Sequence, residues 1–298
     1  MFDWVWLLRV MFLGFVGIGT TAAILSPVLV HNNTDKSQVA GVSSEKTKAI
    51  AKPVSPVPFP ITGQQKQQTT QNVLSRPFNL QQSLTIYSSL FTAPTSLGMV
   101  AIGVAEGNYR LVFSNGTLYV QLTPHYFGHT DPGNLSWGDR VTNYGPCSDQ
   151  GRSGGTLALA EKLCLERARS QLPTQLIDLN TAGIDPNGDL EAVLNAADLY
   201  NQAKSIHSRY FPKALALARQ GGIKGDEALA WARTASFYLN LNNEMDLQTG
   251  SNQATGLLGI CARENYPITE WECVYRDQMR RVKAISSVLE KYKRFSSK

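Results

Sequence analysis

The sequence has little excess charge outside one short stretch. The formal net charge is +5, and residues 31–77 carry six Lys or Arg against two Asp or Glu. The first thirty residues are balanced, so residues 78–298 have a net charge of only +1. A nucleic-acid-binding domain concentrates Lys and Arg on one face. The sequence therefore predicts no nucleic-acid partner.

Metal-binding patterns are also missing. The four cysteines are separated by 17, 97 and 12 residues, so no C-x-x-C pair occurs. His125, His129 and Asp131 lie close together, but His31 and His207 fall in other parts of the chain. Zinc sites usually draw cysteine and histidine ligands from short, regular spacings. We therefore expect no metal and no cofactor.

A long apolar run is present at the N-terminus. Met11–Val30 contains twenty residues without a charge, about the length that a helix needs to cross a bilayer core. Arg9 precedes it, and Trp4 and Trp6 lie where interfacial aromatic residues are expected. This pattern favours a signal anchor with its N-terminus inside. The alternative is a signal peptide that is cleaved near Ala23. Under either interpretation, most of the chain is exported to the periplasm or another extracytoplasmic space.

The cysteines agree with export. Two disulfides are expected in an oxidising compartment. Three pairings are possible, and closeness in sequence favours Cys147–Cys164 and Cys261–Cys273. Four unpaired buried thiols are the alternative.

Residues 31–79 separate the apolar segment (1–30) from a folded domain (80–298). Four prolines between Pro53 and Pro60, followed by the polar run Gln64–Gln71, favour extended and unfolded conformations. Such a composition buries too little apolar surface to offset its ordering entropy. We interpret it as a disordered linker.

The folded domain is predicted to be mainly helical, with a small β-hairpin (α+β). A helix is expected over Thr95–Glu106, with Thr95 or Ser96 as its N-cap and Gly107 after its end. Asn115-Gly116 between two β-prone runs, Tyr109–Phe113 and Thr117–Leu122, predicts a hairpin.

Further helices are expected near residues 156–171, 189–219, 226–240 and 269–294. The second of these is expected to break at Pro212. Asp189 and Asp226 are suitable N-caps, and Thr269 with Glu272 has capping-box spacing.

Glu106 is the residue best placed for chemistry. It would stand at the C-terminal end of an apolar helix, where desolvation and the negative end of the helix dipole both favour a neutral carboxyl group. A protonated carboxylic acid can serve as the general acid toward a glycosidic oxygen. The simpler interpretation is an exposed glutamate before a helix-ending glycine.

A resemblance adds to this reading. Ala105-Glu106-Gly107, the hairpin and Tyr126-Phe127-Gly128-His129-Thr130 resemble the active-site region of the phage-type lysozyme superfamily, which includes muramidases and lytic transglycosylases. In that superfamily a catalytic glutamate and a glycine end a helix before a β-hairpin. The run to Asn134 is similar to uncharacterised exported cyanobacterial proteins with a lysozyme-like domain. The match spans residues 97–137, and residues 226–294 show weaker similarity.

The resemblance implies a lysozyme-like fold and roles for particular residues. Glu106 would be the general acid, and Thr123 lies near the position of a threonine that helps to place water in muramidases. Where those hydrolases have an aspartate in the hairpin turn, this chain has Asn115, which cannot ionise. That departure favours a single-glutamate lytic transglycosylase over a hydrolase with two carboxylates. The expected sugar contacts are Asn115, Tyr126, His129, Asp131, Asn134 and Trp137.

Two function classes follow. The first is an exported, membrane-anchored protein that cleaves peptidoglycan glycan strands as a glycosidase or lytic transglycosylase. The second is a non-catalytic module of the same fold that binds glycan or serves as an envelope scaffold. A disulfide-stapled helical domain with an accidental motif is a third reading. The missing hairpin aspartate favours the second class, and Glu106 with Gly128-His129-Thr130 favours the first.

Overall fold

The computed structural model describes residues 77–130, 135–136, 139–263 and 268–296. All of them belong to one unit of the chain, Ala51–Lys298. The expected apolar segment at residues 11–30 and most of the expected linker lie outside the described residues. No helix within the described ranges is long and apolar enough to span a membrane.

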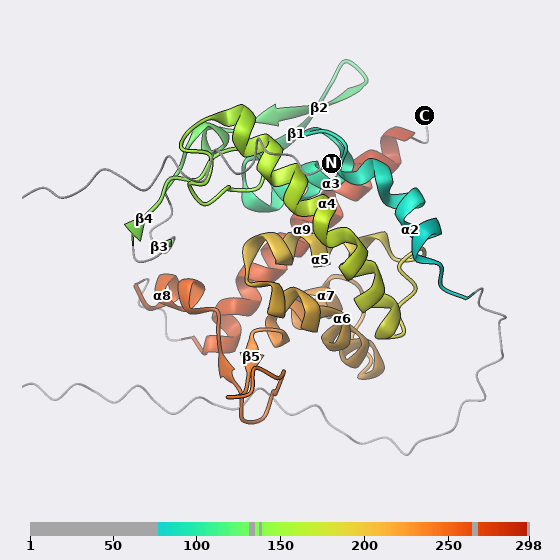
Figure 1. Cartoon of the computed structure of the whole chain (residues 1–298), viewed down its shortest axis with the longest axis vertical. Helices are drawn as coiled ribbons and strands as arrows, with labels where there is room; N and C mark the ends of the chain where they lie inside the picture. The colour runs from blue at the N-terminus through green and yellow to red at the C-terminus, as the bar shows by residue number, and fades with distance from the viewer. Residues whose placement is uncertain (1–76, 131–134, 137–138, 264–267, 297–298) are drawn as a thin grey trace, which may run out of the picture. The chain divides into compact units, whose positions relative to one another are not determined.

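The described part is mainly helical, as predicted, with short two-stranded antiparallel sheets (Figure 1). Its elements in chain order are α2 (Leu80–Tyr87), the 3₁₀ turn η1 (Ser88–Phe91), α3 (Leu97–Glu106), β1 (Tyr109–Ser114), β2 (Thr117–Leu122), the 3₁₀ turn η2 (Pro124–Phe127), β3 (Leu135–Ser136), β4 (Asp139–Arg140), α4 (Leu157–Thr181), α5 (Leu190–Gln202), α6 (Ser205–Gln220), α7 (Gly225–Ala235), β5 (Tyr238–Leu239), β6 (Ser251–Asn252), α8 (Thr255–Arg263) and α9 (Glu270–Ser296).

The helix and hairpin around Glu106 form as predicted. Ser96 is the N-cap of α3, and Gly107 ends the helix with a left-handed φ of 83°. Strands β1 and β2 pair in register from Tyr109↔Leu122 to Ser114↔Thr117. The two turn residues, Asn115 and Gly116, have φ of 48° and 74°, which is the signature of a type I′ turn.

Several predicted helix limits are wrong. The helix expected over 156–171 continues to Thr181 with Pro173 inside it. The expected break at Pro212 is absent, because Pro212 lies within α6 and the chain turns instead at Ala203 and Lys204. Helix α7 ends at Ala235, and Tyr238–Leu239 forms a strand. Helices α2 and α8 were not predicted.

The N-caps were predicted with mixed success. The side chain of Asp189 accepts a hydrogen bond from Ala192 N at 3.0 Å, as expected. Lys224, rather than Asp226, precedes α7, and Asp226 instead accepts a bond from the Ser286 hydroxyl. At α9 the predicted capping box forms, since Thr269 and Glu272 each accept a hydrogen bond from the other's backbone N–H.

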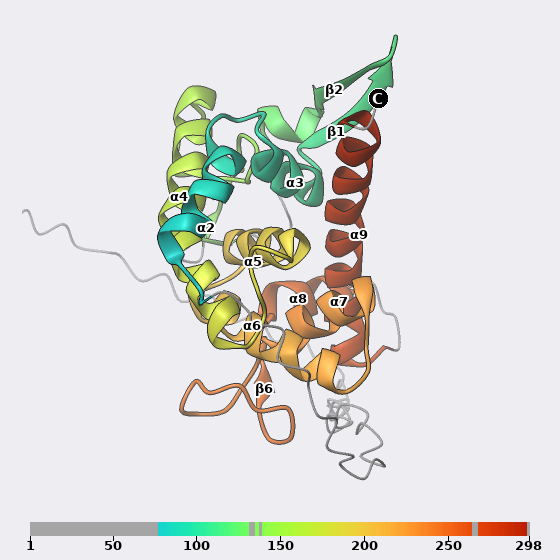
Figure 2. The ribbon, with the colours of Figure 1, turned by 90° about the vertical axis from the view of Figure 1, so that its right-hand side faces the viewer.

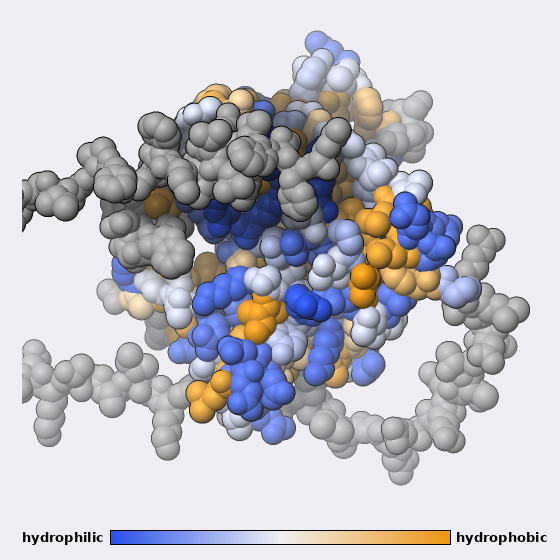
Figure 3. All heavy atoms as spheres, viewed as in Figure 1, coloured by the Kyte–Doolittle hydropathy of each residue, from blue (hydrophilic) through white to orange (hydrophobic). Residues whose placement is uncertain are grey.

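Helix α5 lies at the centre of the core, in contact with α3, α4, α6, α7 and α9. Helix α9 packs on α7 and α3 and reaches β2, so it joins the helical part to the hairpin (Figure 2). Most of the surface seen in Figure 3 is hydrophilic, and hydrophobic residues gather around α2, where Ile86 is 49% exposed. The packing places the end of α3 against α5 and α9.

Candidate functional site

The Glu106 carboxylate lies where three helices meet. Residues 98–103 and Ala105 of α3 are all buried, so the helix is fixed on every side. Gly107 then turns the chain toward β1, which leaves Glu106 as the last helical residue. Its side chain retains 11% of its exposed surface. Glu106 is therefore nearly buried, yet it still reaches solvent.

Arg281 of α9 binds both oxygens of this carboxylate. Its Nη1 donates to Oε1 and its Nη2 donates to Oε2, each at 3.0 Å. Asn201 of α5 donates a third hydrogen bond to Oε1 at 2.8 Å. A bidentate guanidinium–carboxylate pair of this kind is among the stronger hydrogen-bonded contacts in proteins. The predicted desolvated position is thus present, but the polar contacts are those of an ion pair.

The ion pair continues into a buried network. Arg281 Nη1 also donates to Asp198 at 3.1 Å, and Asp198 accepts from Arg233 at 2.6 Å. Neither Arg233 nor Asp198 has any exposed side-chain surface. Asp277 lies 3.6 Å from Arg281 Nε. Buried charges are costly unless paired, so the alternation of carboxylates and guanidiniums explains how this cluster is tolerated.

The charge state of the arginines follows from their neighbours. Burial acts to lower the pKa of Arg281, but Glu106, Asp198 and Asp277 together raise that pKa well above its ordinary value. Burial lowers the pKa of Arg233, and Asp198 opposes the effect. Arg281 is therefore a permanent cation facing Glu106.

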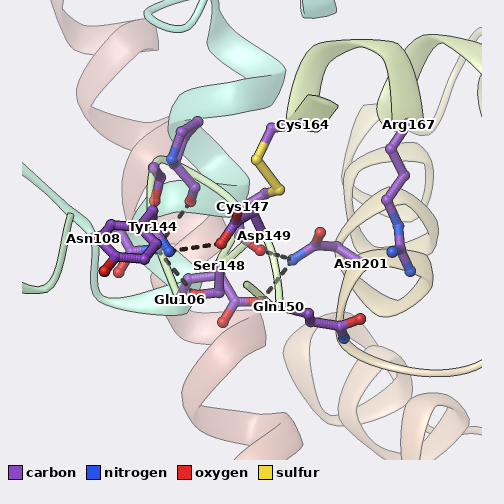
Figure 4. Close-up of a disulfide and its surroundings, with 12 residues drawn as sticks. Glu106, Asn108, Tyr144, Cys147, Ser148, Asp149, Gln150, Cys164, Arg167 and Asn201 are labelled. Atoms are coloured by element: carbon purple, nitrogen blue, oxygen red, sulfur yellow. Dashed lines mark hydrogen bonds between the residues drawn. A yellow bond between two sulfur atoms is a disulfide. The ribbon is translucent and has the colours of Figure 1, made fainter. Parts of the chain in front are cut away.

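The disulfide loop, which the Cys147–Cys164 bond closes, borders the site on another side (Figure 4). Cys147 and Cys164 are bonded, and so are Cys261 and Cys273, which confirms the favoured pairing. The amide of Asn201 that binds Glu106 also donates to Cys147 O at 2.8 Å. Asn108 donates to Gly145 O at 2.9 Å. The loop is thus attached to α4 by its disulfide and to the Glu106 site by amide hydrogen bonds.

The other predicted site residues are dispersed. Thr123 Oγ1 donates to Gly107 O at 2.8 Å, close to the end of α3. Asn115 is exposed at the hairpin tip, away from the helical core. His129 pairs with Asn143 through both backbone groups, and its ring stacks on His125 at 4.9 Å between centroids. Asp131, Asn134 and Trp137 lie outside the described residues.

Tyr126 is a core residue. Its side chain is only 2% exposed, its ring stacks on Tyr109, and its hydroxyl donates to Glu161. Burial and this bond raise the pKa of Tyr126 far above its ordinary value. Its ring therefore fills the interior beneath the hairpin rather than an open sugar surface.

One motif escaped the sequence analysis. Gly151-Arg152-Ser153-Gly154-Gly155 has Gly-x-Ser-x-Gly spacing, but it lies in a turn and no strand leads directly into it, unlike a nucleophile elbow. Ser153 is 5% exposed, and its hydroxyl oxygen accepts from Gly155 N. No histidine of the described part bonds to it. We assign it a structural role.

The cavities and potential metal ligands of the described part do not identify a second site. Surface cavities of about 440 Å³ and 340 Å³ are lined by Ile184, Asp189 and Arg219 and by Pro94, Glu161 and Arg169, respectively, and neither touches Glu106. Within the described ranges, no group of three His, Cys, Asp or Glu residues is placed to hold a metal ion.

Sequence reasoning missed Arg281, Asn201 and Asp198. Their spacing in the chain gives no sign of the site, because Arg281 is 175 residues from Glu106 and stands in a helix rich in charged residues. Searches of family models, curated proteins and solved structures found no match to this chain.

Proposed function

We propose that this chain acts on the glycan strands of peptidoglycan outside the cytoplasm, with Glu106 as the general acid. The observation that carries the proposal is the position of the Glu106 carboxylate at the end of a buried helix, directly before a hairpin and facing α5 and α9. The order of helix, glutamate, hairpin and helical lobe supports a lysozyme-like fold as part of the same proposal.

The disulfides support an extracytoplasmic compartment. Two disulfides and no free cysteine indicate an oxidising, extracytoplasmic environment. We propose that the apolar segment at residues 11–30 anchors the chain in the membrane, or is cleaved after export. Peptidoglycan lies in such a compartment, so substrate and domain would meet there.

General acid catalysis requires that Glu106 take up a proton before it acts. Arg281 has two further carboxylate partners, Asp198 at 3.1 Å and Asp277 at 3.6 Å, so its charge would not be left unpaired if Glu106 took up a proton. Glycan entering beside the hairpin would displace water from the exposed edge of Glu106. Its glycosidic oxygen would then compete with Arg281 for the carboxyl group.

A lytic transglycosylase fits the residues better than a hydrolase. A hydrolase of the inverting type needs a second carboxylate about 6.5–9.5 Å from the first to activate water. The hairpin turn offers only Asn115. Of the two other carboxylates beside Arg281, Asp198 has no exposed surface, and Asp277 is paired with both Arg280 and Arg281. A transglycosylase uses a hydroxyl of the substrate as the nucleophile, so one carboxyl group suffices.

The Arg281 pair also supports the rival function. A carboxylate that is bonded at both oxygens and only 11% exposed is well suited to hold α3 and α9 together. In a non-catalytic glycan-binding or scaffold protein, Glu106 would serve that structural purpose alone.

The test uses the full-length chain, purified in mild detergent and incubated with purified cell-wall sacculi. Mass spectrometry of the soluble products compares the parent with Glu106→Gln and with Glu166→Gln, the same change at an exposed glutamate of α4. Anhydro-muropeptides from the parent and from Glu166→Gln, but not from Glu106→Gln, are expected.

Reducing-end products with the same dependence on Glu106 would identify a hydrolase. If no variant releases material from sacculi that a muramidase digests, the catalytic proposal is wrong. Co-sedimentation of the chain with the sacculi then decides between glycan binding and a purely structural protein.

A further inference from the structure

Arg167 of α4 is a partly buried cation with few partners. Its Nη2 donates to Tyr200 O at 2.8 Å, and its guanidinium carbon lies 4.9 Å from the centre of the Tyr200 ring. Its Nε is closed off from solvent and has no hydrogen-bond partner. Nη1 forms no hydrogen bond with any described residue. Much of its hydrogen-bonding capacity is therefore unused.

Its charge also has no described carboxylate in direct contact. The other buried guanidiniums, Arg233 and Arg281, each contact at least one carboxylate within 4 Å. Among the described residues, no carboxylate lies that close to Arg167. Burial and the nearby positive charge of Arg152 both lower the pKa of Arg167, and Tyr200 and Glu106 only oppose them. A desolvated cation beside another cation is stabilised when an anion binds.

Arg167 adjoins the Glu106 site. It binds the backbone carbonyl of Tyr200, and the next residue, Asn201, donates to Glu106 Oε1. In the view of Figure 4, Asn201 lies between the Arg167 guanidinium and Glu106. Three residues before Arg167, Cys164 holds the disulfide loop that carries Arg152. A ligand at Glu106 that extends past Asn201 would thus meet Arg167.

We propose that the Arg167 guanidinium is a subsite for a carboxylate group on the glycan strand bound at Glu106. Nη1, which forms no hydrogen bond with a described residue, has its N–H groups left for a carboxylate to accept. Lactyl ethers and stem peptides give peptidoglycan such carboxylates, whereas a chitin-like strand has none. The inference rests on the glycan-binding part of the proposed function and not on cleavage. With this subsite, a glycan strand that carries carboxylates would be preferred over a neutral strand.

Binding of three tetrasaccharides tests this subsite. They are a neutral N-acetylglucosamine oligomer, an oligomer alternating with N-acetylmuramic acid, and the latter with its carboxylates converted to methylamides. Calorimetry uses the full-length chain carrying Glu106→Gln, so that no ligand is cut. The acidic oligomer should bind about tenfold or more tighter than its methylamide, the range of one charge-assisted hydrogen bond.

Adding Arg167→Gln should reduce this preference to less than about twofold, while affinity for the neutral oligomers is retained. Lys162→Gln is the matched control, because it removes one exposed cation from the same helix, and it should keep the full preference. Equal binding of the acidic oligomer and its methylamide would overturn the subsite but leave glycan binding intact.

Failure of all three oligomers to bind would instead count against the proposed function. A titration of the wild-type chain with D-lactate then judges the subsite by itself, through the Nε–Hε NMR signal of Arg167. A saturable shift supports a carboxylate site, and no shift refutes it. A tighter response to inorganic phosphate than to D-lactate would refute the carboxylate assignment. This measurement needs no variant to fold for its readout.

Discussion

Arg281 holds both carboxylate oxygens of Glu106 at 3.0 Å and, through the same Nη1, reaches Asp198 at 3.1 Å. One guanidinium therefore connects the end of α3 to α5 from its position on α9. Because its side chain is only 8% exposed, water replaces little of what it provides. Arg281 therefore contributes both to the stability of the domain and to the electrostatic surroundings of Glu106.

Replacing Arg281 with Met is expected to lower the free energy of unfolding by about 3 to 5 kcal/mol, because it leaves Glu106 and Asp198 buried without their shared cation. Lys283→Met removes an exposed cation from the same helix and should change the free energy by less than about 0.5 kcal/mol. Urea unfolding of both variants, followed by circular dichroism without reductant, measures the difference. Equal stability of the two variants would show that the buried pair contributes nothing.

Loss of either disulfide should destabilise the domain by a similar amount, about 3 kcal/mol, because the closed segments are of similar length, with separations of 17 and 12 residues. Their effects on the site should differ. Replacing Cys147 and Cys164 with Ser frees the loop whose carbonyl accepts from Asn201, and the NMR signal of the Asn201 side-chain amide should move. The same replacement at Cys261 and Cys273 should leave that signal in place. A shift in both double variants would contradict this division.

Two glycine substitutions should act in opposite directions. Gly116 has a φ of 74° with no atom near an added Cβ, so Gly116→Ala should destabilise through backbone strain alone, by about 1 kcal/mol. Gly259 lies within α8 and also has open space beside it. Gly259→Ala should therefore stabilise by about 0.5 to 1 kcal/mol. Thermal unfolding of the two variants provides the comparison, and a stabilising Gly116→Ala would exclude the type I′ turn.

His207 should make stability depend on pH. Burial lowers its pKa below the ordinary value of 6.5, and its bond to Ser236 O opposes the effect. The unfolded chain therefore takes up this proton at a higher pH than the native chain. The stability that His207 contributes is complete above about pH 6.5 and is lost as the pH falls through the lower, native pKa. The unfolding free energy of wild type should fall between pH 7.5 and 5 more steeply than that of His207→Gln. Identical slopes would be inconsistent with this account.

Local signals in the sequence predicted the parts of the fold that local interactions determine. Asn115-Gly116 is sufficient to specify its turn, and Gly107 to end α3, because both depend on backbone conformations that few residues adopt. The disulfide pairing was also predictable, since closeness in sequence matched closeness in space. The mainly helical class followed from periodicity.

What escaped prediction depends on tertiary packing. Pro212 sits in the interior of α6, where burial against neighbouring helices outweighs the hydrogen bond that proline removes. Arg281 is one of many charged residues in α9, and only the packing of α9 against α3 makes it the partner of Glu106. Arg167 was missed for the same reason, because nothing near it in sequence shows that its charge lacks a counter-ion.

The separation of Glu106 and Arg281 has a consequence for biosynthesis. The two residues are 175 positions apart, so at about 5 to 20 residues per second a ribosome takes about 9 to 35 seconds to travel between them. During that interval the chain contains Glu106 but not the cation that pairs with it. A chain that ends before α9 therefore cannot form this ion pair, whatever else of the domain it contains.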